Sequence, residues 1–215
     1  MPELPEVETT IRGLQPIVNS TIFNIKIHTT KLRFFIPQNI SMIQKGIKIQ
    51  DIKRLGKYIL LNLNNDHTII IHLGMSGRLR LINTNKFQRK KHDHFILRTN
   101  KDNCVVFNDA RKFGFIDYGK TKEINKKKYI LNLGYEALGK KLTDKYLYSK
   151  INKSIVPIKQ ILLNQSIIAG IGNIYASEIL FNAKISPLIK GKDLSLEECK
   201  QLIISTRKIL KKAIK

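Results

Sequence analysis

The chain has 215 residues, enough for one large domain or two small ones, each with a real core. It carries 39 Lys+Arg against 16 Asp+Glu, a formal net charge of +23, which predicts salt-dependent binding to a polyanion. Nucleic acid is the favoured partner, and the alternatives are a membrane surface or no specific anion, because general compositional bias can also produce a sequence rich in Ile, Lys and Asn. Two cysteines without a CxxC pair argue against a disulfide scaffold or a cysteine-based zinc site. Without a signal peptide or membrane-length apolar run, we expect a cytosolic protein.

The first elements are a proline and a short amphipathic helix. If Met1 is removed, the chain begins with the secondary amine of Pro2, followed at once by the carboxylate of Glu3. At pH 7.5 about a third of an ordinary terminal amine is uncharged but only about 0.1% of a lysine, so the terminus is the better nucleophile for an aldehyde-like carbon. The simpler interpretation is a helix start, because apolar residues recur at helical spacing after Pro5. Both interpretations can hold together.

Residues 21–118 predict an antiparallel β-sandwich or barrel, with one short helix near Asn39–Gln44. Turn-forming residues separate eight short runs rich in β-branched side chains. These runs are Thr21–His28, Ile47–Leu55, Tyr58–Leu63, Thr68–Leu73, Arg78–Ile82, His94–Thr99, Cys104–Phe107 and Phe115–Tyr118.

From about residue 120 the pattern becomes helical. The basic stretch Lys120–Lys128 predicts a boundary between an N-terminal domain, residues 1–120, and a helical domain, residues 129–215. Helices are expected over Asp144–Asn152, Pro157–Leu163, Asn173–Asn182 and from Ser195 to the end, where Ser195 and Glu198 have capping-box spacing. Because the last amphipathic helix runs to Lys215 without a stop signal, the chain is expected to be C-terminally truncated, with a frayed basic tail as the alternative.

Two glycine-containing turns carry candidate residues. Lys57 follows Gly56 at a strand start, and an exposed structural lysine is the simpler interpretation. In His72–Arg78, two glycines predict a tight reversal that directs Met75 outward. Met75 could be an apolar wedge between base pairs, with core or partner packing as the alternative.

Two further loops suit phosphate contact. Asn108–Phe115 combines Arg111 and Lys112 with an aromatic residue beside glycine, as in phosphate contact with stacking, or simply forms a strand turn with solvated charges. Gly170–Glu178 is a glycine-shaped turn that enters a helix near Asn173. Its backbone amides could bind a DNA phosphate, or it could be a structural αα-corner.

Taken together, MPELPEVET, GKYILL, HLGMSGRL, KHDH, DARKFG and GIGNIYASEIL, in this order and spacing, resemble bacterial formamidopyrimidine-DNA glycosylase over the whole chain. That family removes 8-oxoguanine and formamidopyrimidines from DNA and cleaves the strand. The resemblance implies an α+β fold: an N-terminal antiparallel β-sandwich with a flanking N-terminal helix, a DNA cleft, and a helical domain with a helix–two-turns–helix motif.

The resemblance also implies roles for individual residues. Pro2 matches the nucleophile that forms the Schiff base, Glu3 its acid/base partner, and Lys57 a lysine of proton transfer or phosphate contact. Met75, Arg111 and Phe113 match the trio that fills the gap left by the flipped lesion. The implied DNA-binding residues are His92, Arg111, Asn173, Lys159 and, on a looser alignment, Lys153. Excision is then followed by β- and δ-elimination, without a redox cofactor.

One feature of the family has no match here. Its members continue for roughly another fifth of their length and end in a four-cysteine zinc finger. One zinc per monomer is therefore expected in full-length members, but Cys104 and Cys199 do not supply its ligands, so no metal site is assigned to this chain.

The sequence thus favours a base excision repair glycosylase/AP lyase, acting as a monomer on double-stranded DNA with oxidised purines or abasic sites. No membrane association is expected, and the location would be the bacterial cytoplasm, at the nucleoid. The alternative is a truncated, non-catalytic remnant that binds damaged DNA. A third possibility is the endonuclease VIII type, which prefers oxidised pyrimidines, but Leu4, Val7 and the Met75 loop argue against it.

Overall fold

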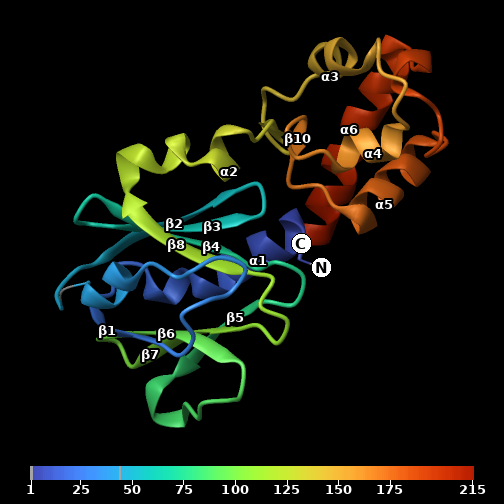
Figure 1. Cartoon of the computed structure of the whole chain (residues 1–215). Helices are drawn as coiled ribbons and strands as arrows, with labels where there is room; N and C mark the ends of the chain where they lie inside the picture. Colours follow the sequence, from blue (N-terminus) through green and yellow to red (C-terminus); the bar gives the residue numbers. More distant parts are fainter. Residues whose placement is uncertain (1, 44) are drawn as a thin grey trace. The chain divides into compact units, whose positions relative to one another are not determined.

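The computed structural model describes residues 2–43 and 45–215, which form two compact units (Figure 1). Pro2 and Glu6–Lys127 belong to the first unit, and Glu3–Pro5 and Lys128–Lys215 to the second. Helix α1, Leu4–Leu14, contributes residues to both units: Leu4 lies in the core of the second, and Val7, Ile11 and Leu14 lie in the core of the first.

The first unit is an antiparallel β-sandwich. One four-stranded sheet has the order β1-β6-β7-β5, and the other has the order β2-β3-β4-β8. The strands are β1 Ile22–Ile27, β2 Ile49–Leu55, β3 Tyr58–Leu63, β4 His67–His72, β5 Arg78–Asn83, β6 Asp93–Thr99, β7 Asn103–Asn108 and β8 Phe115–Lys120. The eight expected strands are therefore confirmed. Of the two expected architectures, sandwich and barrel, the structure has the sandwich.

The main core of this unit consists of side chains from both sheets and from α1. On β3, Ile59, Leu61 and Leu63 are buried and alternate with partly exposed neighbours, as expected for a sheet with one covered face. Strands β6 and β7 are buried on both faces, because Ile96, Cys104 and Val106 form a second cluster with Phe87. That second burial explains why these two strands show only weak alternation in the sequence.

The short helix expected near Asn39–Gln44 is a 3₁₀ helix, Gln38–Met42, without a side-chain cap; Gln44 itself lies outside the described residues. A segment of five residues is too short to form many i to i+4 hydrogen bonds. The 3₁₀ helix, with its i to i+3 hydrogen bonds, is therefore favoured over the α-helix. Other 3₁₀ turns are Gln15–Ile17, Thr84–Lys86, Thr121–Lys126 and Gly191–Asp193.

The second unit is helical. Its elements are α2 Lys128–Leu131, α3 Asp144–Ile151, α4 Ile158–Leu163, α5 Asn173–Ala183 and α6 Leu196–Ile214, with the two-residue parallel strands β9 Tyr135–Glu136 and β10 Ile168–Ala169. The predicted capping box is confirmed: the Ser195 hydroxyl accepts from the Glu198 N–H, and the Glu198 carboxylate accepts from the Ser195 N–H. The expected α+β fold class is thus confirmed. Within the described ranges, no helix has both the length and the apolar character that a membrane crossing requires.

Candidate active site

The carboxylate of Glu3 is fully buried at the N-terminus of α5. It accepts hydrogen bonds from the backbone N–H groups of Gly172 at 2.8 Å, Ile174 at 2.9 Å and Tyr175 at 3.3 Å. A helix start has unpaired N–H groups and a partial positive charge, so an acidic side chain is stabilised there. The expectation that these amides bind a DNA phosphate is therefore wrong for these three, because they hold Glu3 instead.

Two glycines make room for this N-terminal segment. Gly170 has φ +107°, and a Cβ there would lie 2.6 Å from Leu4 Cδ1. Its carbonyl oxygen accepts from the Leu4 N–H at 3.1 Å. A Cβ on Gly172 would collide with the carboxyl group of Glu3. The glycines at 170 and 172 thus allow Leu4 and Glu3 to approach the start of α5; Met1 lies outside the described residues.

Gln165 holds the turn that precedes α5. Its side-chain amide donates to the carbonyl oxygens of Leu163 at 3.0 Å and Ile171 at 2.7 Å, and its oxygen accepts from the Gly170 N–H at 2.9 Å. Sequence reasoning did not identify Gln165, since a single glutamine in a loop has no distinctive spacing. It is a positioning residue for the Glu3 site.

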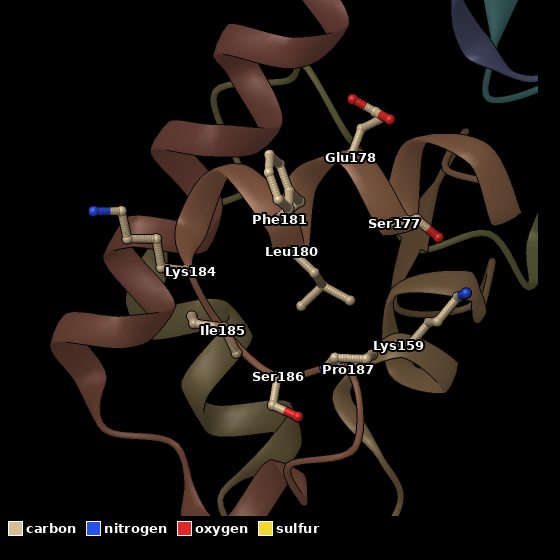
Figure 2. A pocket seen from close by; sticks show the side chains of 9 residues that line it. All are labelled: Lys159, Ser177, Glu178, Leu180, Phe181, Lys184, Ile185, Ser186 and Pro187. Carbon is tan, nitrogen blue, oxygen red and sulfur yellow. The ribbon is translucent and has the colours of Figure 1, made fainter.

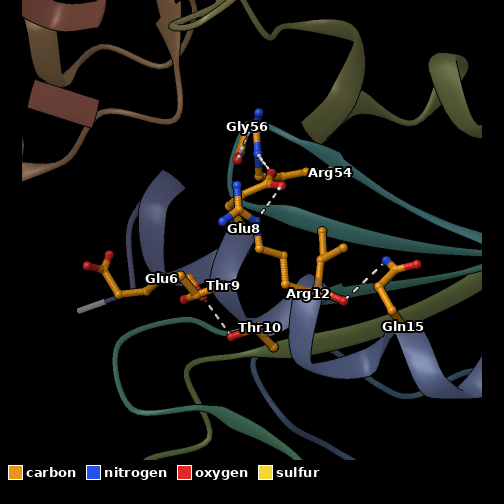
Figure 3. Close-up of polar contacts among 9 residues, drawn as sticks. Glu6, Glu8, Thr9, Thr10, Arg12, Gln15, Arg54 and Gly56 are labelled. Atoms are coloured by element: carbon orange, nitrogen blue, oxygen red, sulfur yellow. Dashed lines mark hydrogen bonds and ion pairs between the residues drawn. The ribbon is translucent and has the colours of Figure 1, made fainter. Parts of the chain in front are cut away.

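Lys57 lies in the turn between β2 and β3, after Gly56, whose φ is +56°. Figure 3 shows how Arg54 supports this turn: its guanidinium donates to the Glu8 carboxylate of α1 at 2.9 Å and to the Gly56 carbonyl oxygen at 3.2 Å. Arg54 is largely buried, with 13% of its side chain exposed. This ion pair ties the Lys57 turn to α1, and sequence reasoning assigned no such role to Arg54 or Glu8.

The loop with Met75 and the loop with Phe113 pack so closely that their backbones are in contact. Gly74 has φ +63°, and a Cβ there would collide with backbone atoms of Phe113 and Gly114. Met75 is 43% exposed and Phe113 46%, and the Arg111 guanidinium lies 5.3 Å from the Phe113 ring centre. The structure thus places the three predicted wedge residues on two adjacent loops of one unit, with both apolar side chains directed outward.

The buried carboxylate of Asp109 joins these two loops. It accepts from the Ser76 hydroxyl at 2.5 Å, the Gly114 N–H at 2.8 Å and the Arg111 N–H at 3.3 Å. Asp109 is fully buried, and its contact with the Gly114 N–H is buried as well. Sequence reasoning treated Asp109 only as part of a motif. Its contacts nevertheless set the geometry of the two loops that carry Met75 and Phe113, called here the wedge loops.

His72, at the end of β4, is a neutral imidazole beside the wedge. Its Nδ1 accepts from the Gly74 N–H at 3.0 Å, which leaves the proton on Nε2. Burial first, and then the positive charges of Lys57 and Arg33, lower its pKa to about 4. His72 also lines a cavity of about 390 Å³ together with Arg33, Gly74, Met75 and Phe113. It was missed because a lone histidine at a strand end gives no sequence signal.

His92 is partly exposed and precedes β6. Its carbonyl oxygen accepts from the Asp109 N–H at 3.1 Å, so the structure brings His92 to the wedge loops. The next residue, Asp93, is fully buried and accepts from Arg80 and Asn108, each at 2.8 Å. These contacts, which include an ion pair with Arg80, hold the segment that carries His92.

Three candidate DNA-binding residues lie in the helical unit. Asn173 is exposed at the first position of α5, beside the Glu3 carboxylate, and Lys153 is exposed after α3. Lys159 in α4 lines a pocket of about 640 Å³ that also includes Ser177 and Phe181 of α5 (Figure 2). Asn173, Ser177 and Phe181 are all exposed on α5.

The residues present do not fit the zinc site that the resemblance implies. Cys104 and Cys199 are both buried, in different hydrophobic clusters of different units. In residues 2–43 and 45–215, no group of three or more His, Cys, Asp or Glu side chains could hold a metal ion. We therefore derive no chemical step from a metal.

Comparison with protein families finds two matches. Residues 1–116 match the formamidopyrimidine-DNA glycosylase N-terminal domain, and residues 133–215 match the H2TH domain of the same glycosylase. A formamidopyrimidine-DNA glycosylase of Zymomonas mobilis is 43% identical over 215 residues, which are 100% of this chain and 78% of the relative. One of Wolbachia pipientis is 42% identical over 216 residues, with the same coverage of 100% and 78%.

Solved structures give the same result. The Fpg protein of Lactococcus lactis in complex with DNA that contains an abasic site has a TM-score of 0.89 and 35% identity. The match covers 99% of this chain and 78% of that protein. A complex of the wild-type L. lactis protein with DNA containing N7-benzyl-Fapy-dG has a TM-score of 0.90, also at 35% identity, and covers 99% and 79% of the two chains.

Proposed function

Because this chain belongs to the formamidopyrimidine-DNA glycosylase family, whose members are bifunctional enzymes of base excision repair, we propose that the nitrogen of Pro2 is its nucleophile. The chain is a DNA glycosylase with AP lyase activity, and its partner is DNA. The observation that supports the assignment is the docking of Glu3 on three backbone amides of α5, since this fixes the residue next to Pro2. The proposal requires that Met1 is removed, because only then does Pro2 have a free amine.

Amine chemistry then accounts for both activities. The lone pair of the Pro2 nitrogen forms a bond to C1′ of the damaged nucleotide, and the glycosidic bond breaks as the base leaves with its electron pair and takes up a proton. The nitrogen then loses its proton, the C1′–O4′ bond breaks and O4′ takes up a proton, which opens the sugar ring and gives an iminium ion between Pro2 and C1′. This cation acidifies the C2′ proton, whose removal expels the 3′ phosphate. A second elimination expels the 5′ phosphate, and water hydrolyses the iminium to restore the amine.

Glu3 and Lys57 serve this sequence as charged partners. The carboxylate of Glu3, held beside Pro2, stabilises positive charge on the prolyl nitrogen and exchanges protons with the sugar. Lys57 contacts a phosphate or transfers a proton during strand cleavage. The turn that carries Lys57 is fixed by the ion pair between Arg54 and Glu8, at 2.9 Å.

The wedge loops complete the substrate site. Met75 and Phe113 fill the gap in the duplex when the damaged nucleotide is flipped out, and Arg111 contacts the orphaned base. Extrusion of a base costs a few kcal/mol of stacking and pairing, which these side chains offset in part. The remaining DNA contacts come from His92, Asn173, Lys159 and Lys153.

The substrates follow from this site and from the family. They are 8-oxoguanine and formamidopyrimidines in double-stranded DNA, together with abasic sites. The enzyme acts as a monomer in the bacterial cytoplasm, at the nucleoid. The proposed steps at Pro2 need neither a redox cofactor nor a metal, since an amine and proton transfers suffice.

Borohydride trapping tests the proposal. The reagent reduces the iminium, so the chain should become covalently linked to a duplex with one abasic site. An uncleaved N-terminal tag blocks the Pro2 amine and should abolish the adduct, whereas the same tag at the C-terminus should leave it unchanged. Salt-dependent DNA binding by a correctly processed chain that gives no adduct would contradict the proposal and favour a non-catalytic DNA-binding protein.

A further inference from the structure

Several large apolar side chains are exposed in the segment that follows α1. Phe23 on β1 is 50% exposed, Phe35 is 71% exposed, and Met42 at the end of the 3₁₀ helix is 75% exposed. Contiguous exposed apolar surface on a soluble protein commonly marks an interaction site. None of these three side chains takes part in the site described above.

Cations lie over two of these aromatic rings. The Lys45 ammonium is 4.8 Å from the Phe23 ring centre, and the Lys31 ammonium is 5.1 Å from that of Phe35. Phe23, Lys31, Phe35, Met42 and Lys45 are called here the aromatic–basic surface. Proteins that bind single-stranded nucleic acid commonly combine aromatic rings with cations. The bases stack on the rings, and the phosphates bind to the cations.

The charge around this surface has one sign. Residues 9–50 contain no Asp or Glu but six Lys or Arg residues, at positions 12, 26, 31, 33, 45 and 48. After burial, the positive charges of Arg89 and Lys26 are the largest causes that lower the pKa of His28, in agreement with a positive local field. Such a field attracts a polyanion and disfavours a basic partner.

Phe35 and Met42 also line a hollow of about 880 Å³, together with Ile27, His28 and Gln38. This volume can accept an unstacked base. The hollow therefore combines an apolar wall with neighbouring cations. A surface that contacts only the phosphates of a duplex needs cations but no such apolar wall.

Backbone and side-chain contacts connect this segment to the wedge loops. The Arg33 N–H donates to the Gly114 carbonyl oxygen at 3.1 Å, and the Lys112 ammonium donates to the Thr29 hydroxyl at 3.3 Å. Phe34 also packs edge-on against Phe115, with ring centres 5.3 Å apart. The segment that carries Lys31 and Phe35 is thus joined to the wedge loops within the first unit.

We propose that the aromatic–basic surface binds single-stranded DNA, with bases stacked on Phe35 and Phe23 and phosphates on Lys31 and Lys45. Unpaired nucleotides beside the wedge are the occupants that its position and charge fit. The inference rests on the proposed function only in taking DNA as the ligand, since it needs no reaction at Pro2.

The experiment measures fluorescence anisotropy of a labelled twelve-residue oligodeoxythymidylate. Phe35→Ala should weaken binding about 5- to 100-fold, the range of base–aromatic stacking, and Phe35→Tyr should retain it. The matched control is Leu131→Ala, because Leu131 is 66% exposed but lies on α2, in the other unit. Equal affinity of the wild type and the double variant Phe35→Ala/Met42→Ala, or equal losses in Phe35→Ala and Leu131→Ala, would overturn the proposal.

Two further measurements separate the possible failures. Unlabelled polyglutamate and unlabelled oligodeoxythymidylate are compared as competitors of the labelled oligonucleotide. Equal competition by the two, together with unchanged DNA affinity of Phe35→Ala, would show a general anion-binding surface and refute the stacking proposal. Borohydride trapping on a blunt abasic duplex should be unchanged by Phe35→Ala. If the wild-type chain gave no trapped adduct, the proposed nucleophile would be contradicted. The oligodeoxythymidylate result would not be affected, because it does not depend on a reaction at Pro2.

Discussion

Two buried carboxylates, one in each unit, hold the residues around them in different ways. Glu3 and Asp109 are both fully buried, and each accepts backbone N–H hydrogen bonds. Asp109 accepts from residues of two loops, so it fixes the loops that carry Met75 and Phe113, which we propose contact the substrate. Glu3 accepts from the first turn of a helix and is covalently adjacent to Pro2, the proposed nucleophile. Under the proposed function, Asp109 shapes the site and Glu3 takes part in the chemistry.

Replacement of Glu3 by glutamine should give the largest effect. Glu3→Gln keeps the size of the side chain but removes the charge beside Pro2, and general acid–base groups contribute about 100- to 10,000-fold to rate. We expect single-turnover excision of 8-oxoguanine to fall at least about 100-fold on this basis. Excision at the wild-type rate would show that Glu3, like Asp109, only shapes the site.

Gly172→Ala tests whether the docking of Glu3 depends on space at the helix start. The added methyl group would collide with the Glu3 carboxyl group, so both the melting temperature and the trapping yield should fall. Gly13→Ala in α1 is the control, because a Cβ there meets nothing within 4 Å. In that helix the control should stabilise the chain by about 0.5–1 kcal/mol. Equal behaviour of the two variants would contradict the docking.

Asp109→Asn should separate shape from chemistry. One carboxylate oxygen becomes an NH₂ group that faces an N–H or hydroxyl donor, and an unsatisfied buried partner costs about 1–3 kcal/mol. Urea unfolding should report this loss, and excision from duplex DNA should slow. Borohydride trapping on abasic DNA, which needs no base excision, should persist. Ser76→Ala, which removes one donor and leaves the charge, should have a smaller effect.

The last prediction concerns the pH dependence of stability that His72 produces. Its pKa is lowered from 6.5 to about 4, so the unfolded chain binds this proton more readily than the folded chain. The stabilisation is present above pH 6.5 and is lost as pH falls toward 4, by at most about 3 kcal/mol. Urea unfolding of His72→Phe should lack this part of the pH dependence. A constant difference from the wild type between pH 7 and pH 4 would contradict it.

Local patterns predicted most of the fold. Strands such as β3 alternate between buried and exposed residues, and α6 has a capping box, so their limits lie within the sequence itself. The two-residue strands β9 and β10 were missed because their parallel pairing is non-local and too short to leave a period. The 3₁₀ form of Gln38–Met42 was missed because five residues do not distinguish helix types.

The resemblance named Glu3 and the exposed wedge residues, but the buried contacts that hold them were not predicted. The family resemblance identified Met75, Arg111 and Phe113, which the structure brings together. The contacts of Glu3 join positions about 170 residues apart, so no local spacing predicts them. Gln165 and Asp109 also act through backbone partners, whose positions only the folded chain defines.

The most direct test of the central claim is the location of the covalent adduct. The chain is trapped with borohydride on abasic-site DNA and digested with protease and nuclease, and the modified peptide is sequenced by mass spectrometry. The account predicts a peptide that begins at Pro2, without Met1, and carries the reduced sugar remnant on its terminal nitrogen. A remnant on Lys57 or another lysine, or an active enzyme that retains Met1, would contradict it.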